Sequence, residues 1–260
     1  MEKTIKDLKT SYIEKGEQKD DLIFIFHGWG SKKEVHMSMI DTLSLKYRVI
    51  AVDLCGFGNS EEPKTPWFVD DYVDFSVEFI KSFNADKVIL LGHSFGCRII
   101  IKMLNKKNLP FKVEKAIFTG GAGIKPKRPL KYYLKVYTYK FCKKILNISF
   151  VKQIFPNALE KYSKNKGSAD YINSSPIMKQ TLTNTVNEDL TPLLKNINIE
   201  TLLIWGENDT ATPLSDGQRM EKDIKNSGLV VLKNAGHFSF IDQEYTFNEV
   251  LKSFLKIGGK

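Results

Sequence analysis

The apolar positions of this chain alternate between short, mostly apolar runs, of which residues 22–26 are unbroken, and longer stretches with helical spacing. The runs lie at residues 22–26, 48–53, 87–91, 113–119, 200–205 and 229–232. Runs of this kind are typical of parallel strands that are buried on both faces of a sheet. Helical spacing recurs between them, at residues 34–46, 70–83, 97–105, 214–225 and 240–255. Strands that alternate with helices predict an α/β fold, with a mostly parallel central sheet and helices on both faces.

Two segments depart from this alternation. Residues 4–15 predict two short strands, paired as an antiparallel hairpin at the sheet edge. Residues 124–190 predict no strand, and apolar residues recur there every three or four positions from Leu130 to Ile148. We interpret 124–190 as a helical cap inserted over the carboxyl end of the sheet. Residues 1–123 and 191–260 then form the core domain.

The cap segment also accounts for the net positive charge of the protein. Residues 124–190 contain 13 Lys/Arg and 4 Asp/Glu, an excess equal to the whole net charge of +9. Lysine supplies most of the basic residues, since the chain has arginine only at positions 48, 98, 128 and 219. Proteins that read nucleic-acid sequence commonly use arginine for bidentate contacts. The composition therefore does not favour a nucleic-acid partner.

The remaining composition indicates a protein of the cytoplasm. No apolar run approaches the roughly 18 residues of a membrane span, and the first residues lack a signal-peptide pattern. The three cysteines, Cys55, Cys97 and Cys142, are odd in number and scattered. This pattern favours a reducing compartment over a disulfide framework or a zinc site. We expect neither a metal nor a cofactor, because no metal-ligand cluster and no phosphate-binding loop motif is present.

The candidate chemistry starts at Gly92-His93-Ser94-Phe95-Gly96, between a predicted strand and a predicted helix. A sharp strand-to-helix turn crowds the residues beside its central serine, which explains a glycine two positions away on each side. The turn exposes the serine hydroxyl and directs the next backbone N–H toward an oxyanion formed there. The simpler alternative is an ordinary helix N-cap at Ser94.

At these residues the chain resembles the α/β-hydrolase family, whose nucleophile elbow has this pattern. The resemblance implies that Ser94 is the nucleophile and that the Phe95 backbone N–H is one oxyanion donor. It places the second donor at Trp29, in the His27-Gly28-Trp29-Gly30 loop that follows a central strand. The Trp29 indole is also expected to line the substrate pocket, beside Phe95. Asp53, before a Gly-containing turn, is expected to be structural.

A serine hydroxyl needs a base, and the chain has four histidines. His237 lies in a loop after the last strand, at the carboxyl edge where the site is expected, and in the family the base occupies this place. We interpret His27 as structural and His36 as a surface helix residue. His93 adjoins Ser94, but neighbouring side chains in an elbow point in different directions, so it does not easily reach the hydroxyl.

The base in turn needs a carboxylate. Asp209 follows a buried strand in Gly206-Glu207-Asn208-Asp209-Thr210-Ala211-Thr212-Pro213, which resembles the family's acid loop. Glu207 and Asp242 are the competing carboxylates. The chain order Ser94, Asp209, His237 agrees with that of the family.

The cap is expected to determine the substrate. Its aromatic residues, Tyr137 and Phe141 among them, are candidates for roofing an acyl pocket, although packing onto the core is the simpler interpretation. Its lysines form a solvated face, or they meet an acidic carrier protein or an anionic lipid surface. The oxyanion loop, the elbow and the basic cap are similar to those of pimeloyl-acyl-carrier methyl ester esterases.

These features predict a cofactor-free serine hydrolase of carboxylic esters or thioesters that acts through Ser94, His237 and Asp209. One alternative keeps this triad and hydrolyses a carbon–carbon bond of diketone substrates. Another is a ligand-binding protein on a hydrolase fold without catalysis.

Overall fold

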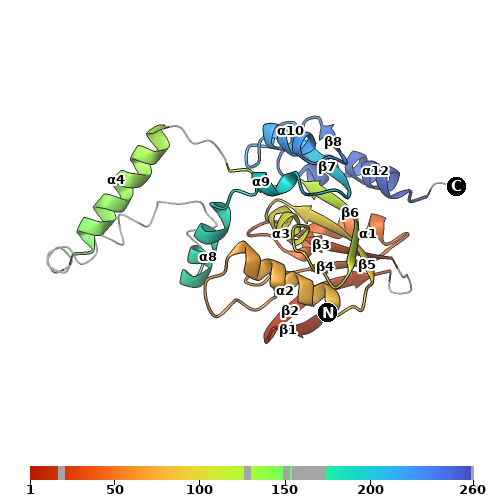
Figure 1. The fold of residues 1–260 in the computed structure, drawn as a ribbon, viewed down its shortest axis with the longest axis horizontal. Coiled ribbons are helices and arrows are strands. Elements are labelled where there is room, and N and C mark those ends of the chain that lie inside the picture. The colour runs from red at the N-terminus through yellow and green to blue at the C-terminus, as the bar shows by residue number, and fades with distance from the viewer. Residues whose placement is uncertain (17–20, 126–129, 149–152, 154–173, 259–260) are drawn as a thin grey trace.

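The computed structural model of the chain describes residues 1–16, 21–125, 130–148, 153 and 174–258. Its centre is an eight-stranded sheet with the order β1-β2-β4-β3-β5-β6-β7-β8 (Figure 1). The strands are β1 (Glu2–Ile5), β2 (Leu8–Lys15), β3 (Leu22–Phe26), β4 (Arg48–Val52), β5 (Lys87–His93), β6 (Lys112–Thr119), β7 (Glu200–Gly206) and β8 (Ser227–Leu232). β1 and β2 pair antiparallel at one edge, and β4, β3, β5, β6, β7 and β8 are parallel. The predicted edge hairpin and mostly parallel sheet are confirmed.

The two faces of the sheet bury two separate apolar cores. Along β3, Phe24 and Phe26 face one core and Ile23 and Ile25 face the other, as the two-residue period of a strand requires. The first core also packs against α2 (Val69–Lys81), α3 (Phe95–Met103) and α10 (Leu214–Asp223). The second packs against α1 (Met37–Leu43) and α12 (Glu244–Leu255). Helices therefore cover both faces, as predicted.

Several helix boundaries differ from the prediction, as three examples show. The stretch 34–46 forms a short 3₁₀ helix, η1 (Lys33–His36), and then α1, after which Tyr47 N–H donates to Leu43 O and the chain turns toward β4. α2 begins at Val69, and Asp71 acts from the third helical position, where its carboxylate accepts the Phe68 N–H at 2.7 Å. The final stretch is divided at Gln243 into α11 (Ser239–Asp242) and α12.

The described part of the predicted cap contains two helices of different placement. α8 (Pro176–Val186) lies against the body of the molecule beside α2, whereas α4 (Leu130–Leu146) lies apart from it (Figure 1). A short helix, α9 (Thr191–Leu194), leads back to the sheet. Residues 126–129, 149–152 and 154–173 lie outside the described residues, so the extent of the cap stays a prediction. None of the helices in the described ranges combines the length and the apolar content that crossing a membrane requires.

Candidate active site

Ser94 lies at the turn between β5 and α3 with φ 50° and ψ −109°, a left-handed backbone conformation that is rare for residues other than glycine. The two flanking glycines are required by contact distances. A Cβ at Gly96 would lie 2.1 Å from Phe26 O, and one at Gly92 would lie 2.8 Å from Cys97 N. The elbow is therefore packed directly against neighbouring backbone, which explains the motif spacing in physical terms.

Backbone hydrogen bonds to the neighbouring segment hold Ser94 in this conformation. Its N–H donates to Thr119 O at 3.0 Å, at the end of β6, and its carbonyl accepts the Ala122 N–H at 3.1 Å. A strained backbone conformation persists only where contacts with the surrounding structure hold it in place. The end of β6 thus holds Ser94, which follows β5, at the carboxyl edge of the sheet.

The two predicted oxyanion donors lie on adjoining segments. Phe95 is the first residue of α3, so its N–H has no partner within the helix, and the Trp29 N–H makes no hydrogen bond within the described residues. The Trp29 and Phe95 rings pack edge to face with centroids 5.3 Å apart. Gly28 lets the oxyanion loop approach the elbow closely, because a Cβ there would lie 2.8 Å from His93 Nδ1 and 3.2 Å from Ser94 Cβ.

Asp209 and His237, which lie in loops after β7 and β8, form a direct hydrogen bond. His237 Nδ1 is 2.8 Å from Asp209 Oδ2. An ionised carboxylate only accepts, so Nδ1 carries the proton and Nε2 keeps its lone pair. The Asp209 side chain is fully buried, whereas that of His237 is 18% exposed. The pair therefore presents a basic nitrogen at the sheet edge that carries Ser94.

Further donors stabilise the Asp209 carboxylate. Its Oδ1 accepts the N–H groups of Ala211 and Thr212, each at 2.9 Å, and Thr212 Oγ1 lies 2.9 Å from Oδ2. Burial raises the pKa of Asp209, but the hydrogen bonds from His237 and Thr212 outweigh burial and bring the pKa below its ordinary value. The sequence did not mark Thr212 as part of the site; the local signal was an Asp in a turn, whose side chain accepts the N–H two residues on, here that of Ala211.

The structure does not place Ser94 Oγ in a hydrogen bond with His237 within the described residues. It does place the base beside the elbow, because the His93 and His237 rings lie with centroids 4.8 Å apart. The competing carboxylates have other partners: Asp242 accepts the Gly236 N–H at 2.7 Å, and Glu207 accepts the Asn234 N–H at 3.3 Å. Neither of these hydrogen bonds involves a histidine ring.

His27 links the oxyanion loop to the loop after β4. Leu54 N–H donates to its Nε2 at 2.9 Å, so the proton lies on Nδ1, which donates to Gly28 O at 2.6 Å. Burial lowers the pKa of His27 to about 4, although the bond to Gly28 opposes this effect. A neutral, doubly bonded imidazole fits the structural interpretation of His27.

The prediction that His36 is a surface residue is wrong. Its side chain is 1% exposed, and its ring packs against those of His93 and Phe240, with centroid distances of 6.0 and 5.0 Å. Neither ring nitrogen has a hydrogen-bond partner in the part of the chain that the structure describes. Burial lowers the pKa of His36 to about 3, so the ring is neutral and behaves as an apolar group.

Asp53 is buried in an ion pair. Its Oδ2 lies 2.5 Å from Lys33 Nζ, and its Oδ1 accepts the Lys33 N–H at 2.8 Å. Gly58 passes directly over the carboxylate, since a Cβ there would lie 2.3 Å from Asp53 Cγ. The pair joins the loop after β4 to η1, in keeping with the structural role expected for Asp53.

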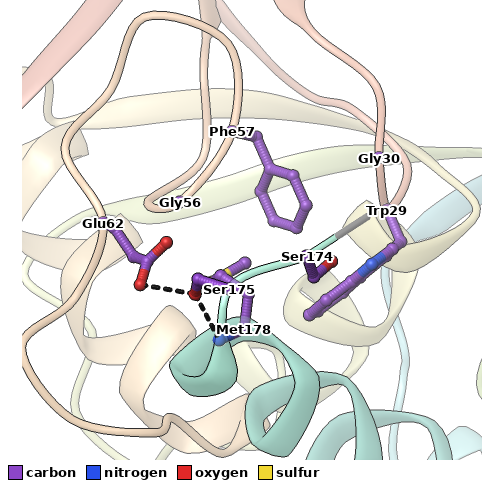
Figure 2. A pocket seen from close by; sticks show the side chains of 8 residues that line it. All are labelled: Trp29, Gly30, Gly56, Phe57, Glu62, Ser174, Ser175 and Met178. Atoms are coloured by element: carbon purple, nitrogen blue, oxygen red, sulfur yellow. Dashed lines mark hydrogen bonds between the residues drawn. The ribbon is translucent and has the colours of Figure 1, made fainter. Parts of the chain in front are cut away.

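A pocket of about 330 Å³ opens beside Trp29 (Figure 2). Its lining comes from the oxyanion loop, the loop after β4 and the start of α8, as Trp29, Gly30, Gly56, Phe57, Glu62, Ser174, Ser175 and Met178. Trp29 was predicted to line a pocket, but the contributions of Glu62 and of α8 were not. No motif marks them, because they meet Trp29 only through the fold.

Three of the four residues predicted to bind substrate do not line this pocket. Phe95 contacts the ring of Trp29 but is not part of the lining. Tyr137 and Phe141 lie on α4, each 65% exposed, and neither belongs to the described lining. The acidic carrier protein and the anionic lipid surface suggested by the cap lysines stay predictions. The predicted catalytic and oxyanion residues, in contrast, gather at the carboxyl edge of the sheet.

Comparison with known proteins gives the same family over most of the chain. A family model described as alpha/beta hydrolase fold matches residues 21–244. An uncharacterized hydrolase, YugF, of Bacillus subtilis is 27% identical over 88% of this chain and 88% of its own length. A 2-hydroxy-6-oxononadienedioate/2-hydroxy-6-oxononatrienedioate hydrolase of Pseudomonas putida is 26% identical over 96% of this chain and 92% of its own.

Solved structures agree on the fold. An esterase from Exiguobacterium antarcticum superposes with a TM-score of 0.74 at 24% identity, covering 98% of this chain and 99% of that one. The sheet order, the elbow and the extent of the family match lead to one conclusion. The chain belongs to the α/β-hydrolase fold family.

Proposed function

We propose that the protein is a serine hydrolase that cleaves carboxylic esters or thioesters through an acyl-enzyme. The observation that carries this proposal is the 2.8 Å hydrogen bond between Asp209 and His237 beside the strained Ser94 elbow. The bond fixes the tautomer in which Nε2 accepts a proton. It also stabilises the imidazolium that forms when Nε2 takes the proton from Ser94.

Each step then has a named group. Ser94 Oγ bonds to the substrate carbonyl carbon as His237 Nε2 takes its proton, and the N–H groups of Trp29 and Phe95 bind the oxyanion. Each such donor is worth about 3–4 kcal/mol of barrier. The alcohol or thiol leaves with the proton from His237. Water then attacks the acyl carbon as His237 takes its proton, and His237 passes that proton to Ser94 Oγ as the acid leaves, which restores the serine and the neutral base.

The contact between Ser94 and His237 is expected to tighten when substrate binds. Catalytic hydrogen bonds are often long in ligand-free enzymes and shorten in the substrate complex. The elbow and the base loop already contact each other through His93, which keeps His237 next to the residue that precedes Ser94.

A second candidate is hydrolysis of a carbon–carbon bond by the same triad. The names of two relatives favour it, the Pseudomonas putida enzyme and a 2-hydroxy-6-oxo-6-(2'-aminophenyl)hexa-2,4-dienoic acid hydrolase of Metapseudomonas resinovorans, which is 23% identical. Activity on a vinylogous diketone together with inertness toward esters would replace the first proposal by this one.

The direct test is to mix the protein with acyl esters and thioesters and to search for an adduct on Ser94 by mass spectrometry. We expect an acyl mass on Ser94, a pre-steady-state burst with p-nitrophenyl esters and labelling by a fluorophosphonate. All three should vanish in Ser94→Ala. Tight ligand binding without turnover, unchanged in Ser94→Ala, would instead indicate a non-catalytic binding protein.

We also propose a reducing compartment, the cytoplasm, as the site of action. All three cysteines are free thiols, with Cys55 and Cys97 buried. Burial raises the pKa of Cys55 to about 12, which keeps it a neutral thiol. Cell fractionation tests this proposal, and recovery from an oxidising compartment would contradict it.

A further inference from the structure

The pocket beside Trp29 has one apolar side and one acidic side. The Trp29 and Phe57 rings pack edge to face with centroids 4.8 Å apart, and Met178 lies across from them (Figure 2). Gly56 makes room for Met178, because a Cβ there would lie 2.5 Å from both Met178 Sδ and Cε. These contacts shape a small apolar surface, suited to a compact hydrocarbon group.

The acidic side is the carboxylate of Glu62. Its Oε1 accepts the Ser175 hydroxyl at 2.7 Å, and Ser175 Oγ in turn accepts the Met178 N–H at 3.1 Å (Figure 2). Ser175 is the N-cap of α8, so the Glu62 carboxylate lies at the positive end of the helix dipole. Oε2 has no hydrogen-bond partner within the described residues. Of the eight lining residues Glu62 alone is ionisable, and none carries positive charge.

α8 is held firmly enough to act as a fixed wall. Trp67 N–H donates to Thr181 Oγ1 at 3.0 Å in the middle of the helix. At its end, Arg98 of α3 donates to the carbonyl of the last helical residue, Val186, at 3.3 Å and to Glu188 O, just beyond, at 2.8 Å. Arg98 is buried and lies on the helix that starts directly after Ser94. The catalytic helix and the pocket wall are therefore joined.

The pocket adjoins the oxyanion site through Trp29, whose ring contacts Phe95. Accepting the proposed function, we propose that this pocket receives an uncharged or cationic group of the substrate and that Glu62 excludes carboxylate-bearing groups. A carboxylate placed there faces a like charge in a partly desolvated site. A hydroxyl or ammonium group instead gains a charge-assisted contact with Oε2.

The test uses three ligands of nearly equal shape: choline, 3,3-dimethylbutanol and 3,3-dimethylbutyrate. Their dissociation constants are measured by calorimetry on the full-length Ser94→Ala protein, so the readout does not depend on turnover. We expect the carboxylate to bind at least about tenfold more weakly than the neutral alcohol, and choline to bind no more weakly than that alcohol.

Glu62→Gln should bring all three affinities to within about twofold of one another, because the charge is lost while the amide oxygen still accepts from Ser175. Glu61→Gln is the matched control, since it removes a neighbouring exposed carboxylate outside the lining and should preserve the tenfold discrimination. Equal binding of carboxylate and alcohol to the starting protein would overturn the proposal. So would discrimination that persists in Glu62→Gln, or the failure of all three ligands to bind. Absence of esterase activity would instead count against the proposed function alone.

Discussion

His93 Nε2 and the backbone carbonyl of His237 form a hydrogen bond with a distance of 3.1 Å. The acceptor is a carbonyl oxygen, so Nε2 carries the proton and donates it. The residue that precedes the nucleophile thus contacts the loop that carries the base. This contact couples the position of the His237 ring to the conformation of the elbow.

We expect His93→Leu to lower kcat by about tenfold, because the carbonyl of His237 loses its donor and the base is less well placed. KM should change by less than about twofold, since His93 is buried away from the pocket. His93→Gln, which keeps a donor at a similar distance, should recover part of the loss. Steady-state kinetics on an ester checks this. Equal rates for the leucine variant and the starting protein would contradict the positioning role.

Asp209→Asn should lower kcat by about 10³- to 10⁴-fold while the protein stays folded. An amide at this position no longer holds the Nδ1–H tautomer of His237, and Nε2 ceases to be the base. The pKa of Asp209 lies below its ordinary value, so activity that depends on the carboxylate is lost only as the pH falls through this lowered pKa. Kinetics with a matched Asp242→Asn variant provides the comparison. A similar loss in that variant would mean that the acid has been assigned to the wrong residue.

The buried His36 should make the fold sensitive to acid. Its folded pKa is lowered by burial from 6.5 to about 3, so below pH 6.5 the unfolded chain binds a proton that the folded protein does not. The free energy of unfolding then falls by about 1.4 kcal/mol per pH unit as the pH decreases toward the folded pKa. His36→Leu should remove this share of the slope and leave stability at neutral pH unchanged or higher, because no hydrogen bond is lost.

Denaturant unfolding at several pH values between 7.5 and 4.5 checks the His36 prediction. Met37→Leu, at an exposed neighbouring position, should keep the full slope. If the slopes of His36→Leu and of the starting protein coincide, the buried imidazole is not the acid-sensitive group.

Gly96→Ala should destabilise the fold by more than about 2 kcal/mol and abolish activity, because the added methyl meets Phe26 O and must displace the elbow. The matched control is Gly228→Ala on β8, where an added Cβ has no atom within 4 Å. That variant should be neutral or stabilised by up to about 1 kcal/mol. Thermal unfolding and ester kinetics on both variants check the contrast. Comparable stabilities would refute the close packing of the elbow.

Much of the fold follows from short stretches of sequence. Strand runs such as residues 22–26 are apolar at every position. Such strands are typical of a parallel sheet whose two faces are both covered by helices, and residues 22–26 are all buried. The elbow motif is short enough to recognise in the sequence, although the crowding that requires its glycines is only partly local: Gly92 is crowded by Cys97, and Gly96 by Phe26 of β3. The candidate roles of Asp209 and His237 could also be predicted from the sequence, because each residue lies in the loop that directly follows a predicted strand.

The remaining features depend on contacts between distant segments. His36 has helical neighbours that suggest a surface position, yet Phe240 and His93 enclose it from other elements. Glu62 enters the pocket only because α8 brings Ser175 against it. The sequence by itself determined which residues are chemically competent, because backbone sterics and side-chain type act locally. The tertiary structure decided which of them meet and which groups are buried, because these depend on how separate helices and loops pack around one sheet edge.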